Sequence, residues 1–269
     1  MSSTVSRTAD TGLEVIDVLG DAAFAARPSH ARDIAGQMDA MKRIADSFLE
    51  KPEGILQELV NAAVDLCGAD SAGISIVKDD STDESFYHWV ATAGQYSGFL
   101  NAVLPRYPSA CGITLERRRA QLFRVGQPFF DIMGIEAPLV TDGILLPWQV
   151  DGTQGTIFVM AHGRTEAFNA DDYRVMQILA DFAAMGIRHQ RQQKLAVEQA
   201  KAAAAAAMAN ELAHKINNPL QGLTNILFLA AEGQHFSDAR TVGEEASADL
   251  KKLSILVQEL LTLPLGKTR

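Results

Sequence analysis

The sequence predicts an α+β protein in which an antiparallel sheet flanked by helices is followed by a long helix and an antiparallel helical hairpin. Three observations predict this class. Apolar residues recur at helical spacing early in the chain, short β-branched or aromatic segments separated by turn residues follow, and the helical period returns at Asn169 and barely stops afterwards. With 269 residues, the chain has room for two domains but not for a third of ordinary size.

The N-terminal part is expected to begin with a mobile leader over residues 1–33, because these residues are mostly small and polar. From Ile34 to Phe48 the apolar residues follow each other at intervals of three and four, which predicts an amphipathic helix that Pro52 ends. A second amphipathic helix is predicted from Ile55 to Leu66.

Four short segments then have the composition of strands. Residues 72–77 and 86–91 are predicted to form one hairpin, and residues 144–150 and 156–161 a second one joined by the turn sequence DGTQG. The segment 94–143 between them is rich in proline and aromatic residues and is expected to be a long irregular loop. Loops of that length usually carry function.

The C-terminal part is predicted to be helical. Asn169 is a suitable cap, and a helix unbroken from residue 171 to 232 would be about 93 Å long at about 1.5 Å per residue. No single globular domain buries such a rod, so we expect a signalling or dimerising stalk. Residues 189–207 would be its Ala- and Gln-rich linker, and residues 264–269 a tail.

A break is expected at residues 232–234, followed by a last helix over about 237–263. Its apolar positions Ala246, Leu250, Leu253 and Val257 are spaced by four, three and four, which is typical of a coiled coil or a four-helix bundle. One hairpin of two such helices leaves half of its apolar seam uncovered. We therefore expect two chains to combine their hairpins as a homodimeric four-helix bundle.

Composition excludes several classes of partner. The chain has 24 Lys and Arg against 33 Asp and Glu, a net charge of −9, which argues against a nucleic-acid-binding surface. It shows no apolar stretch long enough for a signal peptide or a membrane span, so no membrane partner is expected. Only two cysteines, Cys67 and Cys111, are present, which favours a reducing, cytoplasmic compartment.

The clearest chemical signal is carried by one string on the predicted helix, Glu211-Leu-Ala-His-Lys-Ile-Asn-Asn-Pro-Leu220. Pro219 in a helix interior removes a hydrogen bond and costs about 3 kcal/mol, so we expect it to kink the helix one turn below His214. The apolar stripe of the helix leaves His214 facing solvent, where its imidazole is a workable nucleophile near neutral pH. An exposed structural histidine beside a kink is the simpler alternative.

This string resembles the phosphoacceptor motif of histidine-kinase dimerisation domains, and the resemblance covers 208–263. It implies that His214 accepts a phosphoryl group and that Asn218 helps to orient it, with Asn217 and Pro219 completing the motif. The family usually has an acid directly after the histidine, where this chain has Lys215. Only six residues follow Leu263, and no glycine-rich phosphate loop is found elsewhere, so no ATP site is expected.

The order helix, hairpin, long loop, hairpin, helix resembles a GAF sensor domain over 34–188. The segments that carry this resemblance are 111–115, 143–148, 155–159 and 168–172. It implies a small-molecule ligand of unknown identity between the sheet and the long loop, with Cys111, Arg117 and Arg119 as candidate contacts. We expect Cys111 to be a small buried residue rather than a bilin anchor or an oxidant sensor. No metal site is expected from His88 or His162, and Trp89 and Trp148 are expected in the core.

Together these features predict a two-component signalling protein in which a sensor domain is coupled to a dimeric phosphotransfer bundle. Its partners would be a second copy of the chain and either a response-regulator receiver domain or a separate kinase. Two alternatives stay open at this point. One is a non-enzymatic ligand-sensing scaffold with a vestigial phosphoacceptor site, and the other is a sensor histidine kinase whose gene continues past Arg269.

Overall fold

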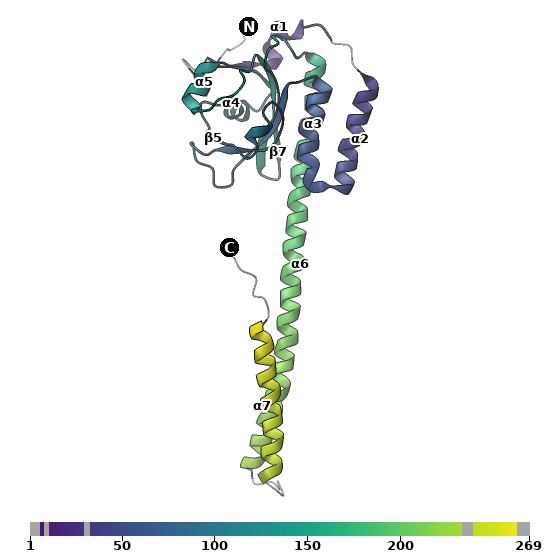
Figure 1. Ribbon diagram of the computed structural model, residues 1–269, viewed down its shortest axis with the longest axis vertical. Helices are drawn as coiled ribbons and strands as arrows, with labels where there is room; N and C mark the ends of the chain where they lie inside the picture. Colours follow the sequence, from purple (N-terminus) through teal and green to yellow (C-terminus); the bar gives the residue numbers. More distant parts are fainter. Residues whose placement is uncertain (1–5, 8–10, 30–32, 233–238, 263–269) are drawn as a thin grey trace. The chain divides into compact units, whose positions relative to one another are not determined.

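The structure, a computed structural model, describes residues 6–7, 11–29, 33–232 and 239–262. The chain divides into two compact units between Gln193 and Lys194, inside the stretch that the sequence assigns to a linker. The helix α6 (Ala170–Ala231) contributes residues to both units (Figure 1). The predicted tail, 264–269, lies outside the described residues.

The first unit contains one sheet and several helices. Its strands are β1 (Ser6–Arg7), β2 (Leu13–Asp17), β3 (Ser71–Val77), β4 (Tyr87–Gly94), β5 (Val103–Leu104), β6 (Gln121–Val125), β7 (Asp142–Val150) and β8 (Thr153–Ala161). Its α-helices besides α6 are α1 (Ala22–Ala25), α2 (Ile34–Glu50), α3 (Ile55–Cys67), α4 (Ala110–Arg117) and α5 (Gln127–Met133). Short 3-10 turns are η1 (Val18–Gly20), η2 (Pro52–Gly54) and η3 (Ser97–Phe99).

The described strands form one eight-stranded sheet in the order β1-β2-β6-β7-β8-β3-β4-β5, and neighbouring strands are antiparallel. Both predicted hairpins are present, as β3 with β4 and as β7 with β8. The second hairpin closes tightly, because Val150 pairs with Thr153 across a turn in which Gly152 has a φ of 78°. The α+β class that the sequence predicts is therefore confirmed.

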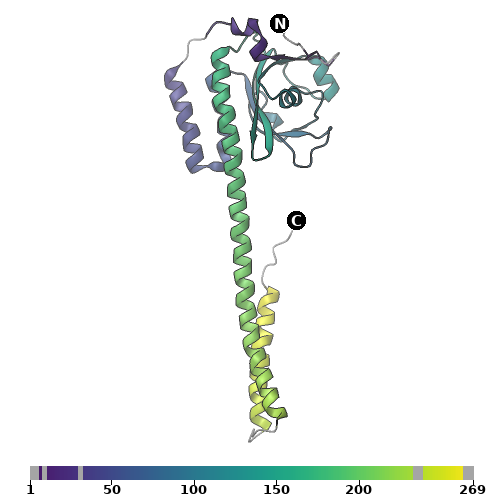
Figure 2. The ribbon, with the colours of Figure 1, turned by 180° about the vertical axis from the view of Figure 1, so that it is seen from behind.

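The two faces of the sheet carry separate cores, because successive side chains of a strand point to opposite faces. Along β8, Ile157 and Val159 pack with α2, α3 and the first turns of α6. Phe158 and Met160 point to the other face, toward the segment that holds α4 and α5. Figure 2 shows α2, α3 and the start of α6 side by side on one face of the sheet.

The prediction of a mobile leader is wrong for residues 11–29. β2 pairs with β6 over its whole length, and Leu13 and Val15 are buried. Arg27 is held by a buried ion pair to Asp142, with 2.7 Å between Nη1 and Oδ2. Five strand residues among small polar ones are too short a signal to be recognised before their partner strand is known.

The prediction that 94–143 is an irregular loop is also wrong in part. This stretch contains the strands β5 and β6 and the helices α4 and α5. Each of these elements is at most eight residues long. The strand β6 pairs with β2 from the N-terminal segment, so no local hairpin pattern predicts β6.

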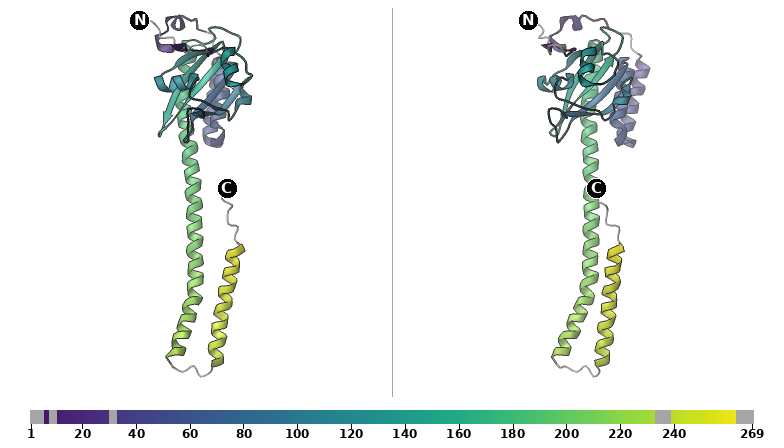
Figure 3. Two further views of the ribbon diagram at one scale, coloured as in Figure 1. Left: turned by 90° about the vertical axis from the view of Figure 1, so that its left-hand side faces the viewer. Right: turned by 60° about the vertical axis from the view of Figure 1, so that its left-hand side comes forward.

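The second unit is a helical hairpin made of the later part of α6 and of α7 (Ala239–Thr262) (Figure 3). The predicted break begins at Glu232, which follows the last helical residue, while residues 233–238 lie outside the described residues. The helix α6 continues through Pro219, and Figure 3 shows it bending where it runs beside α7. In the described part of the chain, no helix combines the length and the apolar character that crossing a membrane requires.

Candidate functional site

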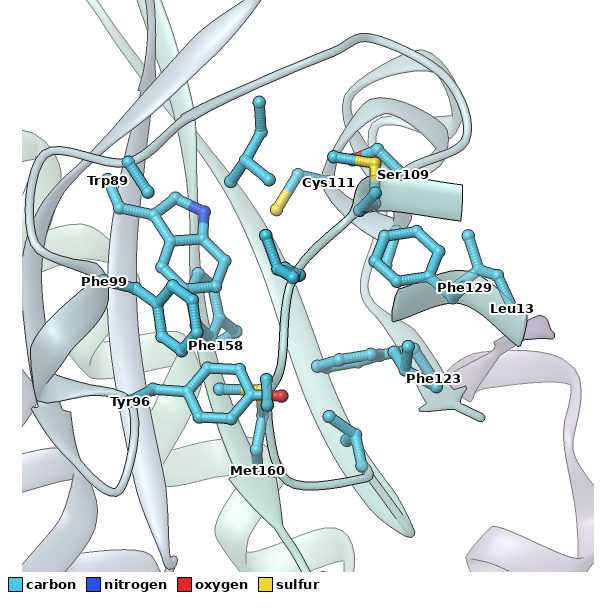
Figure 4. A pocket seen from close by; sticks show the side chains of 18 of the residues that line it. Leu13, Trp89, Tyr96, Phe99, Ser109, Cys111, Phe123, Phe129, Phe158 and Met160 are labelled. Carbon is cyan, nitrogen blue, oxygen red and sulfur yellow. The ribbon is translucent and has the colours of Figure 1, made fainter. Parts of the chain in front are cut away.

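The first unit contains a cavity of about 200 Å³ on the sheet face opposite α2 and α3. It lies between β4, β6 and β8 and the covering segment that includes α4 and α5 (Figure 4). Aromatic rings make up much of its wall, namely Tyr87, Trp89, Tyr96, Phe99, Phe123, Phe129, Phe130 and Phe158. None of the described residues that line it carries a charge.

Two glycines in the sheet make room for the rings that form the floor of the cavity. A Cβ atom at Gly73 would collide with the ring of Phe158, and one at Gly143 would collide with the ring of Phe123. Both rings therefore lie against bare backbone of the neighbouring strand. A larger residue at either position would drive a ring toward the cavity.

Trp89 is held within a cluster of aromatic rings. Its ring centroid lies 6.0 Å from that of Tyr96 in a stacked arrangement, 6.1 Å from Phe99 and 5.0 Å from Phe158. Such contacts fix the orientation of the indole. Its Nε1 is buried and has no hydrogen-bond partner in the described structure. The indole therefore presents an unused donor at the cavity wall.

The other polar groups of the cavity have partners. The hydroxyls of Tyr87 and Ser109 bond to each other, and the hydroxyl of Tyr96 donates to the carbonyl of Pro138 at 2.7 Å. The Sγ of Cys111 accepts a bond from the hydroxyl of Thr156 at 3.2 Å. Burial raises the pKa of the Cys111 thiol and, well above its ordinary value, that of the Tyr87 phenol.

Of the ligand-contacting residues predicted from the sequence, Cys111 lines the cavity, while Arg117 and Arg119 are not among the described residues of its wall. Arg117 donates to the side chain of Gln121 at 2.6 Å, and Arg119 pairs with Asp17 at 2.7 Å. The thiol of Cys111 is buried and protonated, which is unfavourable for a covalent anchor because the thiolate is the nucleophile.

His88 lies on β4, and His162 directly follows β8. His162 stacks on Tyr96 with 4.9 Å between the ring centroids, and its ring nitrogens lie 2.7 Å from the hydroxyl of Ser71 and 2.9 Å from the carbonyl of Leu139. Burial, and then the charge of Lys78, lower the pKa of His88. Among the residues that the structure describes, no group of three or more His, Cys, Asp or Glu side chains could hold a metal ion.

The second unit carries the phosphoacceptor-like string on α6. His214 is exposed, as are Asn217 and Asn218, whereas Pro219 is buried. Lys215 pairs with Glu211 one turn earlier, with 2.7 Å between Nζ and Oε1. This contact with Lys215 lowers the pKa of Glu211. The cation that follows His214 is therefore partly neutralised by an acid on the same side of the helix.

A shallow groove between α6 and α7 lies beside this string. Lys215, Asn218 and Pro219 line it from α6, and Asp249, Lys252, Ile255 and Leu256 line it from α7. The two helices approach closely at Gly222, where a Cβ atom would collide with the carboxylate of Asp249. Lys252 pairs with Asp249 at 2.8 Å. The groove therefore brings an amide and two paired lysines to one side of the hairpin.

The apolar stripes of the two helices are only partly covered within one chain. Leu223 of α6 and Leu253 of α7 are half-buried. Leu220 is 44% exposed, Leu227 65%, Leu250 57% and Val257 49%. Leu220 and Leu227 are one heptad apart on α6, and so are Leu250 and Val257 on α7, so each pair lies along one line of its helix. We call these four residues the open row.

Several solved structures are similar to the chain over about three-fifths of its length. One is the GAF domain of a phosphoenolpyruvate-protein phosphotransferase from Coxiella burnetii, at 16% identity and a TM-score of 0.46 over 61% of this chain and 99% of that one. Another is the phycoerythrobilin-bound GAF domain from a cyanobacterial phytochrome, at 15% identity and 0.43 over 62% and 100%. A third comprises residues 122 to 287 of a methyl-accepting chemotaxis protein, at 18% identity and 0.43 over 56% and 98%.

At these identities the likeness concerns the fold alone. No family model matches the chain, and the comparison with curated proteins gave no match. The assignment of 208–263 to a histidine-kinase-like hairpin therefore stays a prediction made from its motif and its apolar spacing.

Trp148 is buried in the core, as predicted. Trp89 packs against the core cluster on the other face of the sheet and also lines the cavity, a role that the sequence did not predict. The usable signal was the density of aromatic residues in 94–143, a stretch that contributes Tyr96, Phe99, Phe123 and Phe129 to the wall. Their convergence on Trp89 depends on how the segment folds back over the sheet, which spacing along the chain does not reveal.

Proposed function

We propose that the chain is a dimeric signal-transduction protein in which a small-molecule sensor unit controls a histidine phosphotransfer hairpin. The observation that carries the proposal is the exposed His214, four residues before Asn218 and five before Pro219, on a helix that pairs with α7. The uncharged cavity of the first unit supports the sensor role, because largely apolar concave pockets are the usual sites of small ligands.

The chemistry assigned to His214 is transfer of a phosphoryl group. A neutral imidazole nitrogen attacks the phosphorus atom, the new N–P bond forms, and the bond from phosphorus to the leaving oxygen of the donor breaks. To Asn218, one turn along the helix, we assign the donation of an amide hydrogen bond to a phosphoryl oxygen. The donor is a separate kinase or the phosphorylated aspartate of a receiver domain.

The proposal is tested by phosphotransfer to the full chain from candidate kinases and phosphorylated receiver domains. The wild type should take up label, and His214→Gln should take up none. His189→Gln is the matched control, because His189 also lies on α6 but in the first unit, and it should keep full labelling. Equal labelling of wild type and His214→Gln would remove His214 from the mechanism.

A second function is favoured by one observation, the lysine that follows His214. In a non-enzymatic scaffold the string would only shape the hairpin, and Lys215 would serve its pair with Glu211. Lys215→Glu restores the acid of the resembled motif and separates the two functions. It should raise the labelling rate of a working phosphoacceptor, whereas in a scaffold labelling should stay absent and only the Lys215–Glu211 pair should be lost.

The homodimer is proposed from the open row. A second copy is the natural occupant, because heptad-spaced leucine and valine side chains on both helices of a hairpin suit the seam of a four-helix bundle. Light scattering of the wild type at micromolar concentration should give twice the mass of the chain. The double variant Leu220→Glu with Leu250→Glu should give the monomer mass, and a monomeric wild type would contradict the proposal.

A further inference from the structure

The cavity of the first unit limits the charge of any ligand. Its described wall contains only uncharged side chains and is dominated by aromatic rings. An ion placed there would lose its hydration without gaining a counter-charge, which is strongly unfavourable. The occupant must therefore be uncharged at neutral pH.

The size of the cavity limits the ligand further. Its volume is about 200 Å³, and an apolar cavity of about 150 Å³ is large enough for benzene. One ring, or two fused small rings, therefore fit without rearrangement. The floor rings of Phe123 and Phe158 rest on Gly143 and Gly73, which favours a flat molecule packed against them.

One polar requirement comes from Trp89. Its indole N–H is buried without an acceptor among the described residues, while the hydroxyls of Tyr87 and Tyr96 have partners. Buried donors in folded proteins are nearly always paired, so an unpaired one at a cavity wall points to a missing acceptor. Figure 4 shows the indole nitrogen of Trp89 on the side of the ring that faces Cys111.

We infer that this cavity binds a neutral, flat aromatic compound of one or two rings that carries a hydrogen-bond acceptor, and that the indole N–H of Trp89 donates to that acceptor. The inference rests on the proposed sensor function and specifies its ligand class. Binding is non-covalent and changes no bond of the ligand.

The test compares three probes of similar size on the full chain by titration calorimetry. Acetophenone has one ring and a carbonyl acceptor, ethylbenzene has the ring but no acceptor, and benzoate carries a negative charge. Acetophenone should bind about three- to tenfold more tightly than ethylbenzene, which is the usual worth of one hydrogen bond. Benzoate should show no binding.

The chain offers a matched control for the donor. It has two tryptophans. The Nε1 of Trp148 is also buried and without a partner among the described residues, but Trp148 packs in the core on the other face of the sheet. Trp89→Phe should bring acetophenone down to the affinity of ethylbenzene, whereas Trp148→Phe should leave the preference unchanged. Gly73→Ala, which pushes the Phe158 ring toward the cavity, should weaken both neutral probes.

Fluorescence gives an independent readout, because Trp148→Phe leaves Trp89 as the single tryptophan. Acetophenone should change the emission of that variant and leave the emission of Trp89→Phe unchanged. Equal affinity of the two neutral probes, preference for benzoate, or no binding of any probe would overturn the ligand class. These results would leave the labelling of His214 untouched, so failure of this inference is distinguishable from failure of the proposed function.

Discussion

The two units of the chain bury their apolar residues to very different extents. In the first unit, the large apolar side chains from α3, α6 and the central strands are fully enclosed, as Leu59, Ile157 and Leu179 show with 0% exposure. In the hairpin, leucines of the open row keep about half of their surface in water. The first unit therefore encloses a core of its own, although Ile34, Met38 and Leu49 on α2 are exposed, whereas the hairpin has no comparable core within the described chain.

The polar groups differ in the same way. Arg27 and Asp142 of the first unit form an ion pair whose side chains are 6% and 1% exposed. The pairs of the hairpin, such as Lys215 with Glu211, are open to solvent. Because solvent screens exposed charges, the same type of contact has a large effect in one unit and a small one in the other. Mutations can measure this difference directly.

The largest effect is expected from breaking the buried ion pair. Arg27→Met leaves the carboxylate of Asp142 buried without its cation, which should lower the free energy of unfolding of the first unit by about 3–5 kcal/mol. Among the described residues, the carboxylate of Asp142 then keeps only the bond from the backbone N–H of Phe168. Urea denaturation followed by tryptophan fluorescence measures this unit alone, because both tryptophans belong to it.

The control for this prediction is an ion pair at the surface of the same unit. Arg43 pairs with Glu58 at 2.7 Å, but its side chain is 45% exposed. Arg43→Met should therefore cost less than about 1 kcal/mol. If the two variants lost the same free energy of unfolding, burial would not explain how much the ion pair of Arg27 with Asp142 contributes to stability.

The next effect tests whether the open row is covered in solution. Leu179→Ala creates a cavity in the first unit and should lower the free energy of unfolding by about 2–5 kcal/mol at any protein concentration. Leu227→Ala should be nearly neutral in a hairpin without a partner. In the proposed dimer it should cost about 2 kcal/mol, and the loss should depend on protein concentration.

Far-UV circular dichroism at two protein concentrations separates these outcomes for Leu227→Ala. A hairpin transition that moves with concentration in the wild type, and weakens in the variant, supports the dimer. A transition that is independent of concentration in both would show that no second copy covers the open row.

The elements that sequence reasoning placed correctly are those whose signal lies within one segment. The β7–β8 hairpin has alternating apolar residues and a local turn, and α6 has a helical period and its cap, with the side chain of Asn169 accepting from the N–H of Asp171 at 2.8 Å. The motif around His214 is likewise contiguous. These elements are determined mainly by the spacing of residues within one segment, so that spacing is enough to predict them.

The elements that it missed depend on distant partners. β2 is stabilised as a strand by β6, more than a hundred residues away, and α1 lies beside Arg27, whose carboxylate partner is on β7. The cavity is a still clearer case, because Trp89 becomes a wall residue only when the segment with α4 and α5 covers it. Such packing between distant segments overrides local propensity, and no short stretch of the sequence predicts it.

The smallest expected effect concerns pH, and it too should differ between the units. Burial raises the pKa values of Tyr87 and Cys111 in the first unit. Above about pH 8.5, the ordinary pKa of cysteine, unfolded chains lose protons that folded chains keep, so stability falls as pH rises. The slope should reach about 1.4 kcal/mol per pH unit for each proton.

In the hairpin the sign is opposite, because Lys215 lowers the pKa of Glu211, and the small contribution of that exposed pair is lost as pH falls. Urea denaturation between pH 7 and pH 10, followed by tryptophan fluorescence, measures the alkaline loss in the first unit. The double variant Tyr87→Phe with Cys111→Ala removes both groups and should make the slope shallower, while Tyr96, whose pKa burial also raises, remains. If the slope were unchanged, the loss of stability at alkaline pH would come from groups other than Tyr87 and Cys111. Burial of these two residues at the cavity wall would then not explain it.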